Sequence, residues 1–88
     1  MLRRRVIVRG RVQGVFFRAS CADEARSRGV TGWVANQPDG SVEAVFEGED
    51  AAVTAMVEWS RGGPAYAHVT EVEVLAEPAL GESGFTVR

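Results

Sequence analysis

Two glycines flank a short loop that could bind an anion through the main chain. Gly10 and Gly14 enclose a polar stretch, and from Arg18 onward the composition is that of a helix. Glycine allows backbone angles that turn successive N–H groups to one side, and a helix carries a partial positive charge at its N-terminal end. Each N–H bonded to a charged oxygen contributes about 1.5–3 kcal/mol, so about four or five would hold a phosphate without a metal. The loop is not of the Walker A type, because Gly-x4-Gly-Lys-Ser/Thr is missing.

Arg18 falls in the first turn of the expected helix. A cation is disfavoured there by up to about 1 kcal/mol, because it meets the positive end of the helix dipole. A bound dianion would reverse the sign of this effect, and a guanidinium matches two phosphate oxygens at once. Arg18 is therefore a candidate phosphate-binding residue, and the alternative is a surface arginine that covers Phe17.

Asn36 closes a strand-like segment and precedes the turn residues 37–40. Asparagine is depleted in strands and common beside turns, so one interpretation is a turn-capping residue. The other is chemical: a neutral carboxamide can accept a hydrogen bond from a water molecule while donating to a phosphoryl oxygen. Such placement can supply up to about 7–11 kcal/mol of a reaction barrier. Asn36 is thus the second candidate for chemistry.

The other reactive or polar side chains are predicted to have structural rather than catalytic roles. His68 begins a strand and is expected at the surface or a strand edge, whereas Cys21 is expected in the core. The apolar side chains of residues 15–17 are expected to pack in the core and the loop. Gln13 could contribute its side-chain amide to the loop or only its backbone. No Cys/His cluster has metal-ligand spacing, so no metal site is predicted.

The order of elements predicts an α+β fold. Segments rich in β-branched residues alternate with two segments of helical periodicity, and glycine or proline separates them. The expected strands are residues 5–9, 30–36, 41–47, 69–75 and 85–87, and the expected helices are residues 18–28 and 48–60. In the fourth strand Val72 and Val74 are expected to face inward. The order β-α-β-β-α-β plus a short final strand is the ferredoxin-like split βαβ sandwich, a mostly antiparallel sheet with two helices on one face. We expect residues 1–88 to form a single domain.

Charge is unevenly distributed along the chain, whose net charge is −2. Residues 1–28 carry eight arginines and two acidic residues, whereas residues 29–88 carry two arginines and ten acidic residues. A positive first third on an acidic body favours a focused anion site over the broad basic surface of a nucleic-acid-binding domain. The arginines at 3–5 are interpreted as a solvated strand start that could add to this positive field.

Cysteine usage and hydropathy indicate the compartment. The single cysteine excludes an intramolecular disulfide, and no apolar run has the length of a signal peptide or a membrane span. A soluble protein of the reducing cytoplasm, without membrane contact, is expected.

Two segments resemble the signature sequences of the acylphosphatase family. Residues 10–18, GRVQGVFFR, are similar to the first signature, G-x-V-Q-G-V-x-[FY]-R. The second signature, including its spacing, is similar to residues 32–36 (GWVAN), Gly40, Val42 and Gly48. The tail is also similar, so the resemblance spans essentially the whole chain. Position 16 is phenylalanine where many members carry glycine, a difference that bears on loop packing and substrate preference rather than on the family.

The resemblance implies hydrolysis of acyl phosphates to carboxylate and inorganic phosphate, with no cofactor. It implies that Arg18 and the loop backbone hold the phosphate and that Asn36 orients the attacking water. The implied loop residues are Gln13, Gly14, Val15, Phe16, Phe17 and Arg18. The expected partners are a small-molecule acyl phosphate and inorganic phosphate, as product and inhibitor, with no nucleic acid, and the protein is expected to be a monomer.

A mechanism without a protein nucleophile fits these residues. A carboxylate is a good leaving group, so no general acid is needed, and transition-state charge on the phosphoryl oxygens can be stabilised by loop N–H groups and Arg18. The hypothesis is direct attack by water, with the substrate's own phosphate as a proton acceptor.

Two functions of other classes stay open at this level. One is an anion-binding domain without turnover, of the kind built into larger proteins; the length of the chain and the presence of Asn36 disfavour it. The other is an RNA-binding ferredoxin-like domain, which needs exposed aromatic residues on the two central strands. Phe46 shares a face with Val42 and Ala44, and the body is acidic, so this alternative is the weaker one.

Overall fold

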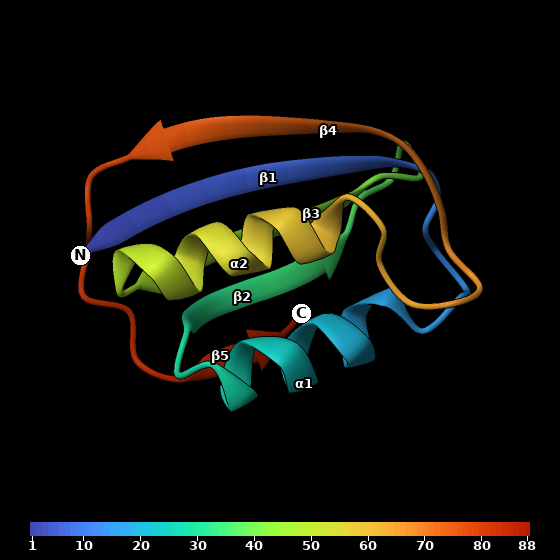
Figure 1. Cartoon of the computed structure of the whole chain (residues 1–88). Coiled ribbons are helices and arrows are strands. Elements are labelled where there is room, and N and C mark those ends of the chain that lie inside the picture. Colours follow the sequence, from blue (N-terminus) through green and yellow to red (C-terminus); the bar gives the residue numbers. More distant parts are fainter.

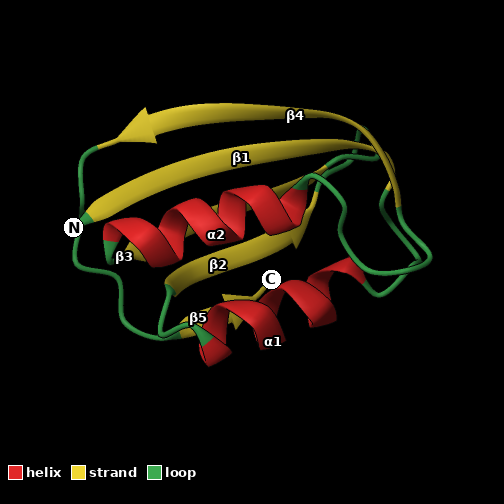
Figure 2. Ribbon diagram, in the orientation of Figure 1, coloured by secondary structure: helices red, strands yellow, loops and turns green.

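The computed structural model describes residues 1–88, and its elements follow the predicted order (Figure 1). The elements are β1 (Leu2–Arg11), α1 (Phe17–Ser27), β2 (Thr31–Asn36), β3 (Val42–Gly48), α2 (Asp50–Ser60), β4 (His68–Glu77) and β5 (Phe85–Val87). Both helices lie on the same face of a five-stranded sheet (Figure 2). The predicted ferredoxin-like α+β architecture is confirmed. Neither helix has the length and hydropathy needed to cross a membrane.

The strand order places the C-terminal ends of β1 and β2 at the same end of the sheet. The order across the sheet is β4-β1-β3-β2-β5, with β2 and β5 parallel and the other neighbours antiparallel. Because β3 runs antiparallel to both β1 and β2, those two strands run in the same direction. Val8 and Asn36 accordingly pair with the same residue of β3, Val42. The loop after β1 and the last residue of β2 are therefore brought together, although they are far apart in the sequence.

The hydrophobic core lies between the sheet and the two helices. Val42, Ala44 and Phe46 alternate toward this side of β3 and are fully buried, as predicted. Cys21 on α1 is buried in the same cluster, which confirms its predicted place. Full burial of a valine- or phenylalanine-sized side chain stabilises a fold by about 1.5–3 kcal/mol relative to exposure. This core fixes both helices against the sheet.

The outer strand β4 departs from the prediction in length and in burial. It begins at His68 and ends at Glu77, beyond the predicted residues 69–75 at both ends. Val74 pairs with buried Val6 and so faces the helices, as predicted, but it is 38% exposed rather than buried. The reason is that β4 is an edge strand, whereas α2 lies over the neighbouring strands β1 and β3.

The first strand is longer than predicted because its arginines are part of the sheet rather than a solvated start. Arg3 is 3% exposed, and its guanidinium contacts the carboxylates of Glu77 at 2.9 Å, Glu82 at 3.1 Å and Glu47 at 3.4 Å. Arg5 pairs with Glu43 and Glu77 on the same open face of the sheet. The predicted solvated strand start is therefore wrong, because carboxylates from later strands surround these side chains.

Glu47 is the centre of this buried ion-pair cluster. Its carboxylate accepts hydrogen bonds from the backbone N–H groups of Leu80 at 2.7 Å and of Gly81 and Glu82 at 2.8 Å. These bonds, that of Leu80 first, together with Arg3 hold the pKa of Glu47 below its usual range, although burial acts in the opposite direction. The carboxylate thereby attaches the segment between β4 and β5 to the open face of the sheet.

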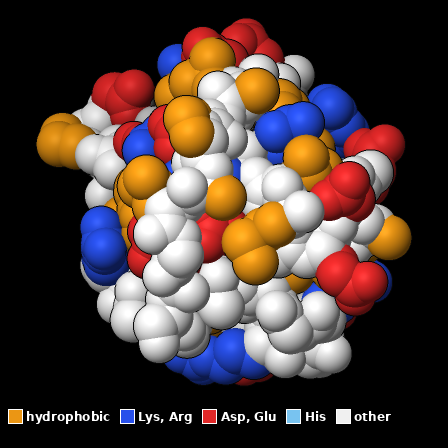
Figure 3. All heavy atoms as spheres, turned by 90° about the vertical axis from the view of Figure 1, so that its left-hand side faces the viewer, with side chains coloured by type: hydrophobic (Ala, Val, Ile, Leu, Met, Phe, Trp, Pro, Cys, Tyr) orange, Lys and Arg blue, Asp and Glu red, His pale blue; other side chains and the backbone are white.

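The uneven charge of the sequence is largely neutralised in three dimensions. Arg3, Arg5 and Arg9 from the basic first third all pair with glutamates from the acidic remainder. At the end of the molecule that carries the N-terminus, basic and acidic side chains lie interspersed (Figure 3). A general positive field from the N-terminal strand is therefore not a feature of the folded protein.

Replacing Glu47 with glutamine is expected to lower the free energy of unfolding by about 1.5–3 kcal/mol, because three backbone N–H groups would lose a charged acceptor, whereas Arg3 keeps Glu77 and Glu82. Since folding lowers the pKa of Glu47, its stabilising contribution is present above the pKa of the unfolded chain and is lost as the pH falls through the folded value. The wild-type protein should thus lose stability below about pH 4, and the variant should lose less over that range. Urea denaturation at neutral and acidic pH measures both effects.

The matched control is Glu71→Gln, which removes an exposed glutamate whose partner is Arg9. An exposed ion pair contributes at most about 1 kcal/mol, so this variant should remain close to the wild type. Equal destabilisation by the two substitutions would contradict the role assigned to Glu47.

Candidate active site

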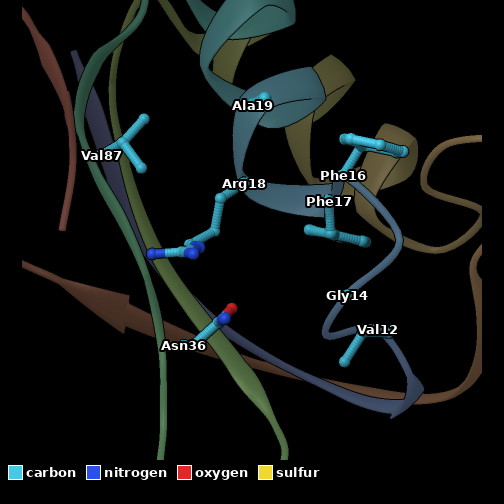
Figure 4. A pocket seen from close by; sticks show the side chains of 8 residues that line it. All are labelled: Val12, Gly14, Phe16, Phe17, Arg18, Ala19, Asn36 and Val87. Carbon is cyan, nitrogen blue, oxygen red and sulfur yellow. The ribbon is translucent and has the colours of Figure 1, made fainter.

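A pocket of about 380 Å³ opens at the end of the sheet where β1 and β2 terminate (Figure 4). It is lined by residues of the loop after β1, the first turn of α1, the end of β2 and β5, namely Val12, Gly14, Phe16, Phe17, Arg18, Ala19, Asn36 and Val87. The side chains of Arg18 and Asn36 extend toward the same space. The structure thus brings together the two side chains that the sequence predicts for chemistry.

Arg18 is in the first turn of α1, as predicted, and it has no acidic side chain as a partner. Its Nη1 donates a hydrogen bond of 2.9 Å to the main-chain oxygen of Arg88, which orients the guanidinium along the pocket wall. No Asp or Glu side chain lies within ion-pair distance of Arg18, in contrast to Arg3 and Arg5. Its positive charge is therefore available to an anion in the pocket.

The side chain of Asn36 makes no hydrogen bond to the rest of the chain, which separates the two interpretations of this residue. The turn that follows it is capped by Asp39, whose Oδ1 accepts from the backbone N–H of Ser41 at 2.9 Å and from its hydroxyl at 2.6 Å. These bonds lower the pKa of Asp39. With the cap supplied by Asp39, the carboxamide of Asn36 is free in the pocket.

The loop before α1 has a backbone of the anion-binding type. Gly14 has a φ of 74° and Phe16 a φ of 65°, so two left-handed residues are separated by one residue. Alternation of this kind turns successive N–H groups toward one side of the chain. None of the backbone N–H groups of residues 13–18 donates a hydrogen bond within the protein. Six consecutive donors are therefore available to a ligand.

Gln13 has a role that the sequence left open. Its Nε2 donates to the carbonyl oxygens of Gln37 at 2.8 Å and of Ser41 at 2.9 Å, so the side chain attaches the loop to the turn after Asn36. Both hydrogens of the amide are occupied, and the N–H that faces a ligand is that of the backbone. The available signal was a polar residue between Val12 and Val15, both of which are buried.

Phe17 anchors the loop to the core, as predicted. Its ring packs against Trp59 with 5.3 Å between ring centroids. A Cβ added to Gly63 would lie 2.6 Å from a carbon of the same ring, so only glycine allows this approach. Val15 is likewise buried.

Phe16 is the residue for which the packing prediction is wrong. It precedes the first residue of α1, and its side chain is 75% exposed. The left-handed backbone at this position points the side chain out of the loop, whereas the flanking Val15 and Phe17 point inward.

The remaining candidates have no part in the pocket. Burial raises the pKa of Cys21 to about 12, which keeps the thiol protonated and unreactive. His68 is exposed on the edge strand, as predicted. Phe46 is fully buried under the helices, so the RNA-binding alternative lacks the exposed aromatic residue that it requires.

Known proteins of one family resemble this chain in sequence and in structure. The model of the acylphosphatase family matches residues 4–87. The curated acylphosphatase of Rubrobacter xylanophilus is 59% identical over 85 residues, covering 96% of this chain and 77% of that protein. That of Haloarcula marismortui is 55% identical over 86 residues, covering 98% of this chain and 94% of that protein. A crystal structure of acylphosphatase from Bacillus subtilis superposes with a TM-score of 0.95 at 40% identity, covering 100% of this chain and 99% of that one. The chain belongs to the acylphosphatase family.

Proposed function

We propose that this protein hydrolyses the carboxyl–phosphate bond of acyl phosphates by direct attack of water, with Arg18 and Asn36 as its working side chains. The observation that carries this proposal is that one pocket contains a guanidinium without an acidic side-chain partner, a carboxamide without a hydrogen bond and a loop of unused N–H groups. Membership of the acylphosphatase family supports the same reaction.

The backbone of Gln13, Gly14, Val15, Phe16, Phe17 and Arg18 would bind the phosphoryl group together with the Arg18 guanidinium. A charge-assisted hydrogen bond contributes about 1.5–3 kcal/mol, so several N–H groups and one bidentate arginine give ample affinity for a dianion. The same donors stabilise the charge that spreads over the phosphoryl oxygens in the transition state. The positive end of α1 adds to this stabilisation.

Asn36 would hold the attacking water. Its carboxamide oxygen accepts a hydrogen bond from the water, while its NH₂ group donates to a phosphoryl oxygen, and no negative charge is added beside the phosphate. The water oxygen forms a bond to phosphorus as the bond from phosphorus to the acyl oxygen breaks. The proton of the water passes to a phosphoryl oxygen of the substrate, and the carboxylate leaves as an anion. These steps need no general acid or general base from the protein, and the side chains that line the pocket include no carboxylate or imidazole.

The same proposal includes the state and setting of the protein. We propose that residues 1–88 act as one domain, since α1 and α2 share one core cluster with the sheet, and that this domain acts as a monomer, because every residue that lines the pocket comes from one chain. Inorganic phosphate, as the product, is expected to compete with substrate for the loop and Arg18. One buried cysteine is compatible with the reducing cytoplasm.

The proposed function is tested by phosphate release from acetyl phosphate in the presence of excess chelator. We expect turnover to be unchanged by the chelator, because the charge on the phosphoryl group is met by N–H groups and Arg18. Turnover lost on chelation and restored by a divalent metal would contradict the mechanism, as would a phosphorylated residue trapped by acid quench. Phosphate binding without turnover would favour an anion-binding domain instead.

A further inference from the structure

Phe16 combines two unfavourable features, of which the left-handed backbone belongs to the anion-binding loop and the exposed ring has no partner in the free protein. Its backbone is left-handed, a conformation that L-residues with a side chain avoid, and its aromatic ring is largely exposed to solvent. No aromatic pair or core contact compensates for this exposure. Strained residues of this kind cluster at active sites and ligand-binding sites.

The geometry of the reaction gives this ring a place beside the substrate. Attack in line requires the leaving acyl group to lie opposite the attacking water across the phosphorus atom. In Figure 4 Asn36 lies at one side of the pocket, and Phe16 lies at the other side, with its ring directed away from Asn36. A phosphoryl group held by the loop therefore directs its acyl group away from Asn36 and toward Phe16.

We propose that Phe16 determines substrate specificity by binding the acyl group, so that acyl phosphates with an aromatic or bulky apolar acyl group are preferred. This inference rests on the proposed function, because it uses the water position assigned to Asn36. An aromatic ring offers an acyl group an apolar face, and its contact with a second ring adds to simple burial. The preference is carried by the side chain of Phe16 and not by its backbone.

The test compares benzoyl phosphate with acetyl phosphate as substrates of the wild-type protein and three variants. Phe16→Leu keeps an apolar side chain and the strained backbone, Phe16→Ala keeps the strain without the bulk, and Phe16→Gly removes both. We expect the ratio of kcat/KM for the two substrates to fall about tenfold in the alanine and glycine variants and to fall by less in the leucine variant, which keeps the apolar contact but not the ring. A change in the glycine variant alone would show that backbone strain is responsible, and it would overturn the inference.

Two further measurements separate the acyl site from the phosphate site. Inhibition by inorganic phosphate, which has no acyl group, reports any change in the phosphate-binding loop itself, and the effect of each variant on the acyl group is read relative to it. Inhibition by benzylphosphonate relative to methylphosphonate should weaken about tenfold in the alanine and glycine variants, a readout that does not depend on turnover. Unchanged ratios for both substrates and phosphonates would overturn the inference.

The matched control is Leu80→Asn, which removes an apolar side chain that is 72% exposed. Leu80 follows β4 at the opposite end of the sheet from the loop after β1 (Figure 1). This variant should retain the wild-type ratio, and an equal fall in it would overturn the inference. If the wild-type protein hydrolyses neither substrate, the proposed function fails, and the phosphonate ratio still shows whether Phe16 binds the organic group.

Discussion

Replacing Arg18 with alanine is expected to lower kcat/KM for acetyl phosphate by at least about 10³-fold. Arg18 contributes the one side-chain cation of the pocket, and it meets charge that develops on the phosphoryl oxygens. Because the same guanidinium binds the phosphate in the ground state, the inhibition constant of inorganic phosphate should also rise, by about 10- to 100-fold. Initial rates of phosphate release and competitive inhibition measure the two effects.

Two controls separate binding from structure in this experiment. Arg28→Ala removes another arginine associated with α1, one paired with Glu24 outside the pocket, and should leave rate and phosphate affinity unchanged. Arg18→Lys keeps the charge but loses the bidentate geometry, so an intermediate loss is expected. The hydrogen bond of Arg18 to the main-chain oxygen of Arg88 also holds the residue that follows β5, so urea denaturation must show that Arg18→Ala remains folded. A folded variant with wild-type phosphate affinity would contradict the role of Arg18.

Replacing Asn36 with alanine is expected to lower kcat by about 10²–10⁴-fold while the affinity for inorganic phosphate changes little. The carboxamide holds water rather than the main charge of the substrate, so its loss affects the rate of the chemical step. Its side chain makes no hydrogen bond within the protein, so stability should be close to that of the wild type. The split between rate and affinity is what distinguishes Asn36 from Arg18.

Asn36→Asp is the sharper variant at this position. Aspartate has nearly the same shape, but its negative charge repels the phosphoryl group, so phosphate affinity should fall as well as rate. Gln37→Ala, which removes the neighbouring amide side chain outside the pocket lining, serves as the control. Equal loss of phosphate binding in Asn36→Ala and Arg18→Ala would show that the two residues do not have separate roles.

The elements of the fold could be predicted because their signals are local. Alternation of apolar residues in β3 and helical spacing in α2 reflect which side of each element is buried, and glycine or proline marks the intervening turns. The boundaries were less accurate where long-range contacts extend an element. Arg3 lies within β1 because the carboxylates of Glu47 and Glu77, more than 40 residues away in the sequence, accept hydrogen bonds from its guanidinium.

The sequence predicted the two side chains and the loop backbone of the candidate site, but not the contacts that hold the loop in place. Arg18 and Asn36 stood out because each breaks a local preference, a cation at a helix start and an asparagine in a strand. The attachment of the loop by Gln13 and the outward position of Phe16 depend on contacts and backbone angles that neighbouring residues do not specify.

The sequence by itself determined the order of strands and helices, the glycines of the loop and the family signatures, because periodicity and backbone preference act between residues close in the chain. The tertiary structure decided which of these parts meet. Because β3 lies between β1 and β2 and runs opposite to both, β1 and β2 end on the same side of the sheet. The loop after β1, with its free N–H groups, therefore lines the same pocket as Asn36. It also decided which arginines are available to an anion, since only folding places glutamates beside Arg3 and Arg5 and leaves Arg18 without one.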